Sequence, residues 1–210
     1  MADEKRNLRL ILAEARQALL PALAQQSSDR VQHHLIESAL YADADTVVLY
    51  APKDNEISTW LILERALADR RRVLFPKIES NDSTLSLMDV RDRQELRPGA
   101  FGLLEPAGSE MVSAAHLERA LICVPGVAFS MSGQRLGRGG GYYDRLLATV
   151  PPSAITVGLA YSFQVLDRLP ESPHDQRLGF IVTTFALYAA RIDDAAAPDA
   201  RTYQGGISKC

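Results

Sequence analysis

The chain has little cysteine, no large excess of charge and no long hydrophobic run. Only two of its 210 residues are cysteines: Cys123, inside an apolar segment, and Cys210, at the last position. Two isolated cysteines do not make the disulfide framework of a small secreted domain, so we expect free thiols in a reducing cytoplasm. Cys123 has no histidine or acid nearby in the sequence, which favours a core position over a nucleophilic one.

The formal net charge is -3 at pH 7, which gives no reason to expect a nucleic-acid or membrane partner. Charges interrupt the amphipathic segment that follows the first residues, so it predicts neither a signal peptide nor a spanning helix. The chain contains 47% hydrophobic and 23% charged residues, as is ordinary for a globular protein. We find no repeats. We expect one domain over residues 1–194, a disordered tail over 195–210, and a monomer or weak homodimer.

Helical and strand patterns alternate along the chain. Apolar spacing predicts helices over about 4–20 (ended by Pro21), 28–41, 58–68 (capped by Ser58) and 142–149. Short apolar runs predict strands over 46–50, 72–76, 84–88, 121–124, 155–161 and 180–183. The alternating residues in 84–88 indicate a half-exposed or edge strand. The order favours an α/β fold with a mostly parallel sheet covered on both faces.

Ligands bind outside the carboxyl ends of the strands in such sheets. That rule places four loops on one rim: 51–57, 76–82, 125–141 and 161–175. The third loop leads into the densest chemistry of the chain, the run RLGRGGGYYD at residues 135–144, which follows the apolar run 121–127.

This run holds four glycines, two arginines, two tyrosines and a carboxylate in ten residues. Glycines expose backbone N–H groups and allow close approach of a ligand. Amides at a helix start and arginine side chains both favour a phosphate. A neighbouring carboxylate suits the metal that accompanies a nucleoside triphosphate. The run therefore predicts a cradle for nucleotide phosphates.

Other interpretations fit less well. A Walker loop would end in Gly-Lys-Ser or Gly-Lys-Thr, whereas this run continues Gly141-Tyr142-Tyr143. A GxGxxG fingerprint starting at Gly137 would need glycine in place of Tyr142. A flexible, solvated hairpin is the remaining alternative, but it has no need of two tyrosines and three consecutive glycines.

Together with PGVAF at 125–129 and Pro173-His174-Asp175, this run resembles the 5-formyltetrahydrofolate cyclo-ligase family. The likeness extends from about Lys5 to Thr184. It includes a Lys-x-x-x-Arg pair at 5–9, a Pro-x-x-x-Glu-Ile turn at 52–57 and a Gly-x-x-Glu-Pro turn at 102–106. The resemblance implies a single three-layer α/β/α domain. It also implies conversion of 5-formyltetrahydrofolate to 5,10-methenyltetrahydrofolate with ATP and Mg²⁺, releasing ADP and phosphate after phosphorylation of the formyl oxygen.

The resemblance also implies the site residues, here in this chain's numbers. The ATP contacts are Lys5, Arg9, Arg135, Leu136, Gly137, Arg138, Gly139, Gly140, Gly141, Tyr142 and Tyr143, with Arg135 and Arg138 as the catalytic cations. The folate contacts are Glu56, Phe101, Arg138, Gly139, Gly140, Gly141 and Tyr142, and the Mg²⁺ ligands are Asp144 and Asp175.

Plainer roles stay open for several of these residues. Lys5 and Arg9, one helical turn apart, could form a solvated basic stripe, and Asp144 could be a first-turn helix acid. Phe101 could simply pack in the core. The family often has acids where this chain has Gly179 and Thr184. A non-catalytic phosphate-ligand sensor on a similar sheet, or a related ligase acting on a different formylated amine, are the alternative functions.

Overall fold

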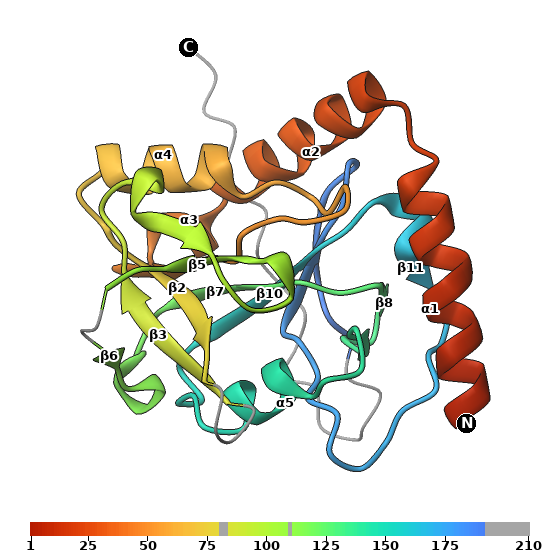
Figure 1. Cartoon of the computed structure of the whole chain (residues 1–210). Helices are drawn as coiled ribbons and strands as arrows, with labels where there is room; N and C mark the ends of the chain where they lie inside the picture. Colours follow the sequence, from red (N-terminus) through yellow and green to blue (C-terminus); the bar gives the residue numbers. More distant parts are fainter. Residues whose placement is uncertain (80–83, 109–110, 192–210) are drawn as a thin grey trace.

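The computed structural model describes residues 1–79, 84–108 and 111–191 (Figure 1). Its main sheet has the spatial order β13 (Leu187–Ala189), β12 (Phe180–Val182), β10 (Ile155–Leu159), β7 (Leu121–Val124), β1 (Thr46–Val48), β2 (Arg72–Ile78), β3 (Leu85–Asp89) and β6 (Met111–Val112). Neighbours from β12 to β2 run parallel, and the outer pairs are antiparallel. The expected α/β fold with a mostly parallel sheet is confirmed.

Helices cover both faces of this sheet. On one face lie α2 (Pro21–Ile36), α3 (Ala39–Ala42) and α4 (Trp60–Ala68), and on the other lies α5 (Tyr142–Leu147) (Figure 1). Successive strand residues point to opposite faces. Val47 therefore packs in the core that contains Leu35 of α2, and Val48 packs in the core that contains Leu146 of α5. The central strands are buried on both sides, which explains their continuous apolar runs.

The first helix, α1 (Ala2–Gln17), lies apart from these layers, beside β8 and β11 (Figure 1). It packs on a small sheet of β11 (Val165–Leu166), β8 (Ala128–Ser130) and β9 (Arg135–Leu136). Leu8 and Leu12, one helical turn apart, contact a cluster with Ala128 and Leu136. This packing holds α1 against the segment that leads into the glycine run.

The predicted start of the second helix at Ser28 is wrong. The helix begins at Pro21, because proline at a first helical position loses no hydrogen bond and has a suitable fixed φ. It also ends earlier than expected, at Ile36. The Ser38 hydroxyl then accepts a hydrogen bond from the Tyr41 N–H at 3.3 Å and begins the separate helix α3.

Other boundaries differ by small amounts. Residues 135–136, expected in a loop, form β9, and α5 ends at Leu147. Ser58 does accept a hydrogen bond from the Trp60 N–H, at 3.2 Å, where α4 begins. The predicted edge strand, β3, lies next to the edge, which the two-residue strand β6 occupies. A further pair, β4 (Leu96–Pro98) and β5 (Leu104–Pro106), forms in the irregular middle.

The expected boundary at residue 194, the expected tail over 195–210 and Cys210 lie outside the described residues. Cys123 is fully buried in β7, where burial raises the pKa of its thiol well above the usual range. The core position expected for it is confirmed. In the part of the chain that the structure describes, no helix combines the length and apolar character needed to cross a bilayer.

Candidate active site

A cavity of about 330 Å³ lies at the carboxyl ends of the parallel strands. Its wall includes Ala51 beyond β1, Pro76 and Ile78 in the second half of β2, and Pro125 and Gly126 beyond β7. The predicted ligand-binding rim and this cavity therefore occupy the same edge of the sheet.

The cavity gathers every predicted site residue except Phe101. Its lining includes Lys5, Arg9, Glu56, Arg135, Leu136, Gly137, Arg138, Gly139, Gly140, Gly141, Tyr142, Tyr143, Asp144 and Asp175. These residues come from α1, the loop after β1, the segment from β9 into α5 and the loop before β12. Residues that are up to 170 positions apart in the sequence thus share one surface.

The glycine run needs its glycines for backbone conformation. Gly139 has φ 105° and Gly141 has φ 68°, a region that side-chain-bearing residues rarely adopt. Gly141 precedes the first residue of α5 and turns the chain sharply into that helix. The run therefore presents bare main chain to the cavity between Arg135 and Tyr142.

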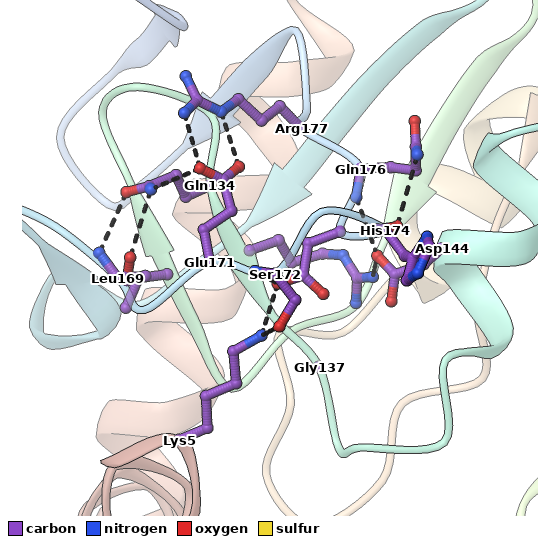
Figure 2. Close-up of polar contacts among 12 residues, drawn as sticks. Lys5, Gln134, Gly137, Asp144, Leu169, Glu171, Ser172, His174, Gln176 and Arg177 are labelled. Atoms are coloured by element: carbon purple, nitrogen blue, oxygen red, sulfur yellow. Dashed lines mark hydrogen bonds and ion pairs between the residues drawn. The ribbon is translucent and has the colours of Figure 1, made fainter. Parts of the chain in front are cut away.

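Helix α1 supplies two cations to the cavity. The Lys5 ammonium donates to Asp175 Oδ2 at 2.6 Å and to Ser172 Oγ at 2.8 Å (Figure 2). Arg9 donates from Nε to the carbonyl of Gly137 at 2.8 Å. Both side chains lie on one face of α1, as their spacing predicts, and they pin the two loops that border the cavity.

Arg135 is a buried cation, only 8% exposed. It donates to Asp144 Oδ1 at 2.7 Å and, at 3.4 Å, to the carbonyl of Pro125. Its Nε has no hydrogen-bond partner within the described residues. Asp144 also accepts from the Gln176 main chain at 3.2 Å (Figure 2), so the first turn of α5, which carries Asp144, meets the loop that carries Asp175.

Neither predicted ligand is an uncompensated acid, because Asp144 pairs with Arg135 and Asp175 pairs with Lys5. Across residues 1–79, 84–108 and 111–191, no three histidine, cysteine, aspartate or glutamate side chains form a group able to hold a metal ion by themselves. A metal at this site would need further ligands from a bound phosphate or water.

Glu56 is a buried carboxylate between two arginines. Its Oε1 accepts from Arg138 at 2.9 Å and lies 3.8 Å from Arg16 NH1, while Oε2 accepts from the Lys53 N–H at 3.1 Å. Arg138 also donates to Asp54 at 3.0 Å. Arg138 is 45% exposed, whereas Arg16 is only 3% exposed.

Two members of this group, Arg16 and Asp54, are not among the residues predicted from the sequence. A signal for Arg16 existed, because it follows Arg9 by seven residues and two helical turns return to the same face. No sequence pattern singled out Asp54, since its role depends on contact with a loop 84 residues away.

Comparison with known proteins decides the family. A model of the 5-formyltetrahydrofolate cyclo-ligase family matches residues 1–184. The chain belongs to this family. The resemblance seen in the sequence is confirmed. Because cyclo-ligases are enzymes that form bonds as ligases, the expectation of a ligase is confirmed as well.

The similarity covers most of each relative. A 5-formyltetrahydrofolate cyclo-ligase of Mycolicibacterium smegmatis is 30% identical over 184 residues, 85% of this chain and 93% of the relative. A mitochondrial cyclo-ligase of Arabidopsis thaliana is 28% identical over 204 residues, 86% of this chain and 74% of the relative. The NMR structure of Aquifex aeolicus 5,10-methenyltetrahydrofolate synthetase is similar with a TM-score of 0.79 and 32% identity, covering 96% of this chain and 99% of that one.

In this cyclo-ligase family member, a buried tyrosine, Tyr50, and a half-buried one, Tyr143, adjoin the charged groups. Burial, and then the negative charge of Glu56, raise the pKa of both Tyr50 and Tyr143 above the usual range. The two hydroxyls therefore stay uncharged at neutral pH. Tyr50 donates to the carbonyl of Ile57 at 2.8 Å, which fixes the turn that carries Glu56.

Phe101 lies outside the cavity lining and is 71% exposed, with φ 54°. The alternative of core packing is therefore wrong, and its contact with folate stays a prediction. Gly179 and Thr184, where the cyclo-ligase family is often acidic, also lie outside the lining. Gly179 donates to Thr156 Oγ1 at 2.9 Å, and the Thr184 hydroxyl bonds that of Ser162 at 2.8 Å.

Hydrogen bonds among Gln134, Glu171 and Arg177, here called the polar strap, hold the loop that carries Asp175. Arg177 donates to both oxygens of Glu171, at 2.8 and 2.7 Å, and Gln134 donates to the same carboxylate at 3.1 Å (Figure 2). Gln134 also donates to the carbonyl of Leu169 and accepts from its N–H. The hydrogen bonds from Arg177 lower the pKa of Glu171 from 4.5 to about 2.

The strap predicts a pH effect on stability. Because the pKa of Glu171 is lower in the folded state, its carboxylate stabilises the fold fully above the unfolded pKa of about 4.5. That stabilisation is lost as the pH falls towards 2. As the pH is lowered over this range, we expect the midpoint temperature of thermal unfolding to fall more steeply for the wild type than for Glu171→Gln. Glu64→Gln, at an exposed position, is the control. Parallel profiles for wild type and Glu171→Gln would contradict the prediction.

Proposed function

We propose that this chain converts 5-formyltetrahydrofolate to 5,10-methenyltetrahydrofolate with consumption of ATP and release of ADP and phosphate. The observation that carries the proposal is one cavity, in a member of the cyclo-ligase family, where four cationic side chains surround a glycine-rich main chain. The cations are Lys5, Arg9, Arg135 and Arg138.

The reaction needs activation of an amide, whose oxygen is a poor leaving group. In the proposed mechanism, the formyl oxygen attacks the γ-phosphorus of ATP and ADP leaves. N10 then attacks the formyl carbon and loses its proton, and the oxygen departs with phosphate. Phosphoryl transfer asks a protein mainly for positioning and charge stabilisation.

The chain's residues divide these tasks. The glycines of the run, at 137 and 139–141, allow close approach of phosphate oxygens to the main chain, and Lys5 and Arg9 add positive charge from α1. Of the four cations only Arg138 is exposed, since the other three are buried or half-buried. Its guanidinium can turn from carboxylates to the transferring phosphoryl group. Arg135, held by Asp144 beneath the run, contributes fixed charge.

Mg²⁺ fits the donor set of this cavity. Asp144, in the first turn of α5, and Asp175, in the loop that contacts it, offer carboxylate oxygens. Mg²⁺ usually keeps several waters and takes one or two carboxylates together with substrate phosphates, so two acids suffice. When bound, the ion would neutralise charge on the phosphates of ATP.

Asp175→Asn is expected to raise the Mg²⁺ concentration for half-maximal turnover at least tenfold, because a neutral amide is a weaker ligand for a hard cation. Asparagine keeps an oxygen that can accept from the Ser172 N–H, now bonded to Asp175 Oδ2 at 2.7 Å, so the loop turn is retained. Turnover measured against Mg²⁺ at saturating ATP gives the answer. Asp167→Asn, at an exposed position outside the cavity lining, is the matched control, and an unchanged Mg²⁺ requirement would remove Asp175 from the metal site.

The proposed reaction is tested directly by mixing the protein with Mg-ATP and 5-formyltetrahydrofolate and recording the absorbance of the methenyl product. We expect product formation coupled one-to-one to ADP release. Binding of ATP without turnover would instead indicate a phosphate-ligand sensor. ATP hydrolysis only with another formylated amine would indicate a related ligase.

A further inference from the structure

Glu105, in β5, is a buried carboxylate in the cavity wall. The proposed reaction assigns no role to it. It is 9% exposed, and Oε1 accepts a single long hydrogen bond, from the Ile78 N–H at 3.4 Å. Within residues 1–79, 84–108 and 111–191 it forms no ion pair. A buried carboxylate is costly unless its oxygens are hydrogen-bonded, so this group has acceptor capacity to spare.

The backbone holds this carboxylate in place. A Cβ atom on Gly99 would lie 2.2 Å from Glu105 Oε2, so only glycine leaves room for the acid. Arg97 stands directly opposite Glu105 in the β4–β5 pair, where a cross-strand ion pair would be expected. Its guanidinium instead donates to the carbonyls of Gln94 and Leu96.

The surroundings of Glu105 differ from the rest of the cavity. Its neighbours in the lining from β2, β3 and the approach to β5 are apolar, namely Pro76, Ile78, Leu85, Leu103 and Leu104. The cations come from α1 and the glycine run. One part of the lining thus suits phosphates, and the other suits a flat apolar ring that carries hydrogen-bond donors.

We propose that Glu105 recognises the pteridine ring of the folate substrate by accepting hydrogen bonds from ring N3–H and from the 2-amino group. A 2-amino-4-oxopteridine presents these two donors side by side on one edge, and a carboxylate presents two acceptors in matching positions. The adenine edge of ATP pairs a donor with an acceptor, so it can satisfy only one carboxylate oxygen. The inference rests on the proposed function for the identity of the substrate, and it sets the pteridine against β5.

The first test measures binding of 5-formyltetrahydrofolate and of Mg-ATP by calorimetry. In Glu105→Gln, the side-chain amide keeps one acceptor oxygen but places its NH2 group opposite the second donor of the pteridine ring. We expect folate affinity to fall about 100-fold, the size of losing one hydrogen bond to a charged group, with ATP affinity unchanged. Glu118→Gln, at an exposed position outside the lining, is the matched control.

A second variant guards against misfolding of the first. Gly99→Ala forces the Glu105 carboxylate to move and should weaken folate binding at least tenfold. Gly108→Ala, where an added Cβ meets nothing within 4 Å, is its control. A third arm uses the wild type alone: an analogue of the substrate with methyl in place of the 2-amino group should bind about 100-fold more weakly. Glu105→Gln should discriminate far less between the two ligands.

The outcomes separate this inference from the proposed function. Unchanged folate affinity in Glu105→Gln, or equal binding of the two ligands by the wild type, overturns the role of Glu105 even if turnover is normal. A loss that falls on ATP assigns the carboxylate to adenine and also overturns it. Discrimination between the ligands without methenyl formation keeps Glu105 as a pteridine contact and overturns the reaction.

Discussion

Arg138→Ala is expected to lower kcat by about 1,000-fold, the lower end for a guanidinium that stabilises a transferring phosphoryl group. The side chain is 45% exposed and bonds only Asp54 and Glu56 in the described structure. Its loss should therefore leave the fold intact, with the thermal midpoint within a few degrees of the wild type. Turnover is followed by methenyl absorbance at saturating ATP and folate.

Arg65→Ala is the matched control for this prediction. Arg65, on α4, is also an exposed arginine in an ion pair, with Asp69 at 2.8 Å, and it lies outside the cavity lining. We expect it to keep full activity. If Arg138→Ala retained wild-type kcat, the glycine run would lose its assignment as the site of phosphoryl transfer.

Glu56→Gln is expected to destabilise the protein by about 3 kcal/mol, because it leaves a buried cation without its counter-ion. Arg16 is 3% exposed, its sole ion pair within the described residues is with Glu56, and Nε and NH1 have no hydrogen-bond partner there. Urea unfolding measures the free energy of unfolding. The same variant should also weaken folate binding, if Glu56 contacts the substrate as the family resemblance implies.

A double variant shows whether Arg16 is the cause. Replacing both partners, Glu56→Gln with Arg16→Met, removes the stranded charge, so it should be clearly less destabilised than the sum of the two single changes. Glu64→Gln, at an exposed position on α4, should stay within about 0.5 kcal/mol of the wild type. Strict additivity would show that the two side chains act independently.

The sequence predicts the sheet and much of the cavity because both follow from local patterns. Buried strands such as β7 are continuous apolar runs, and Lys5 and Arg9 share a helix face by spacing alone. The composition of the run at 135–144 is enough to predict a cradle for nucleotide phosphates. Pro21 shows the limit of such reasoning. Its missing N–H and fixed φ can end one helix, but they suit the first position of the next helix equally well.

The remaining site residues depend on distant contacts. Asp54 gains a role only because Arg138 reaches it from 84 positions away. Glu105 belongs to a recognisable turn motif, yet its burial against Gly99 and its place in the cavity wall arise from the pairing of β4 with β5 and the approach to β2. Phe101 is the reverse case, since the core packing considered for it gives way to an exposed position.

The contacts of α1 bear on how the molecule is made. Helix α1 bonds Gly137 through Arg9 and Asp175 through Lys5, partners that are synthesised 128 and 170 residues later. Closing such long loops is slow compared with local folding. The growing chain therefore cannot complete the cavity wall until Asp175 has been synthesised, and a nascent polypeptide released before that residue would lack part of the cavity lining.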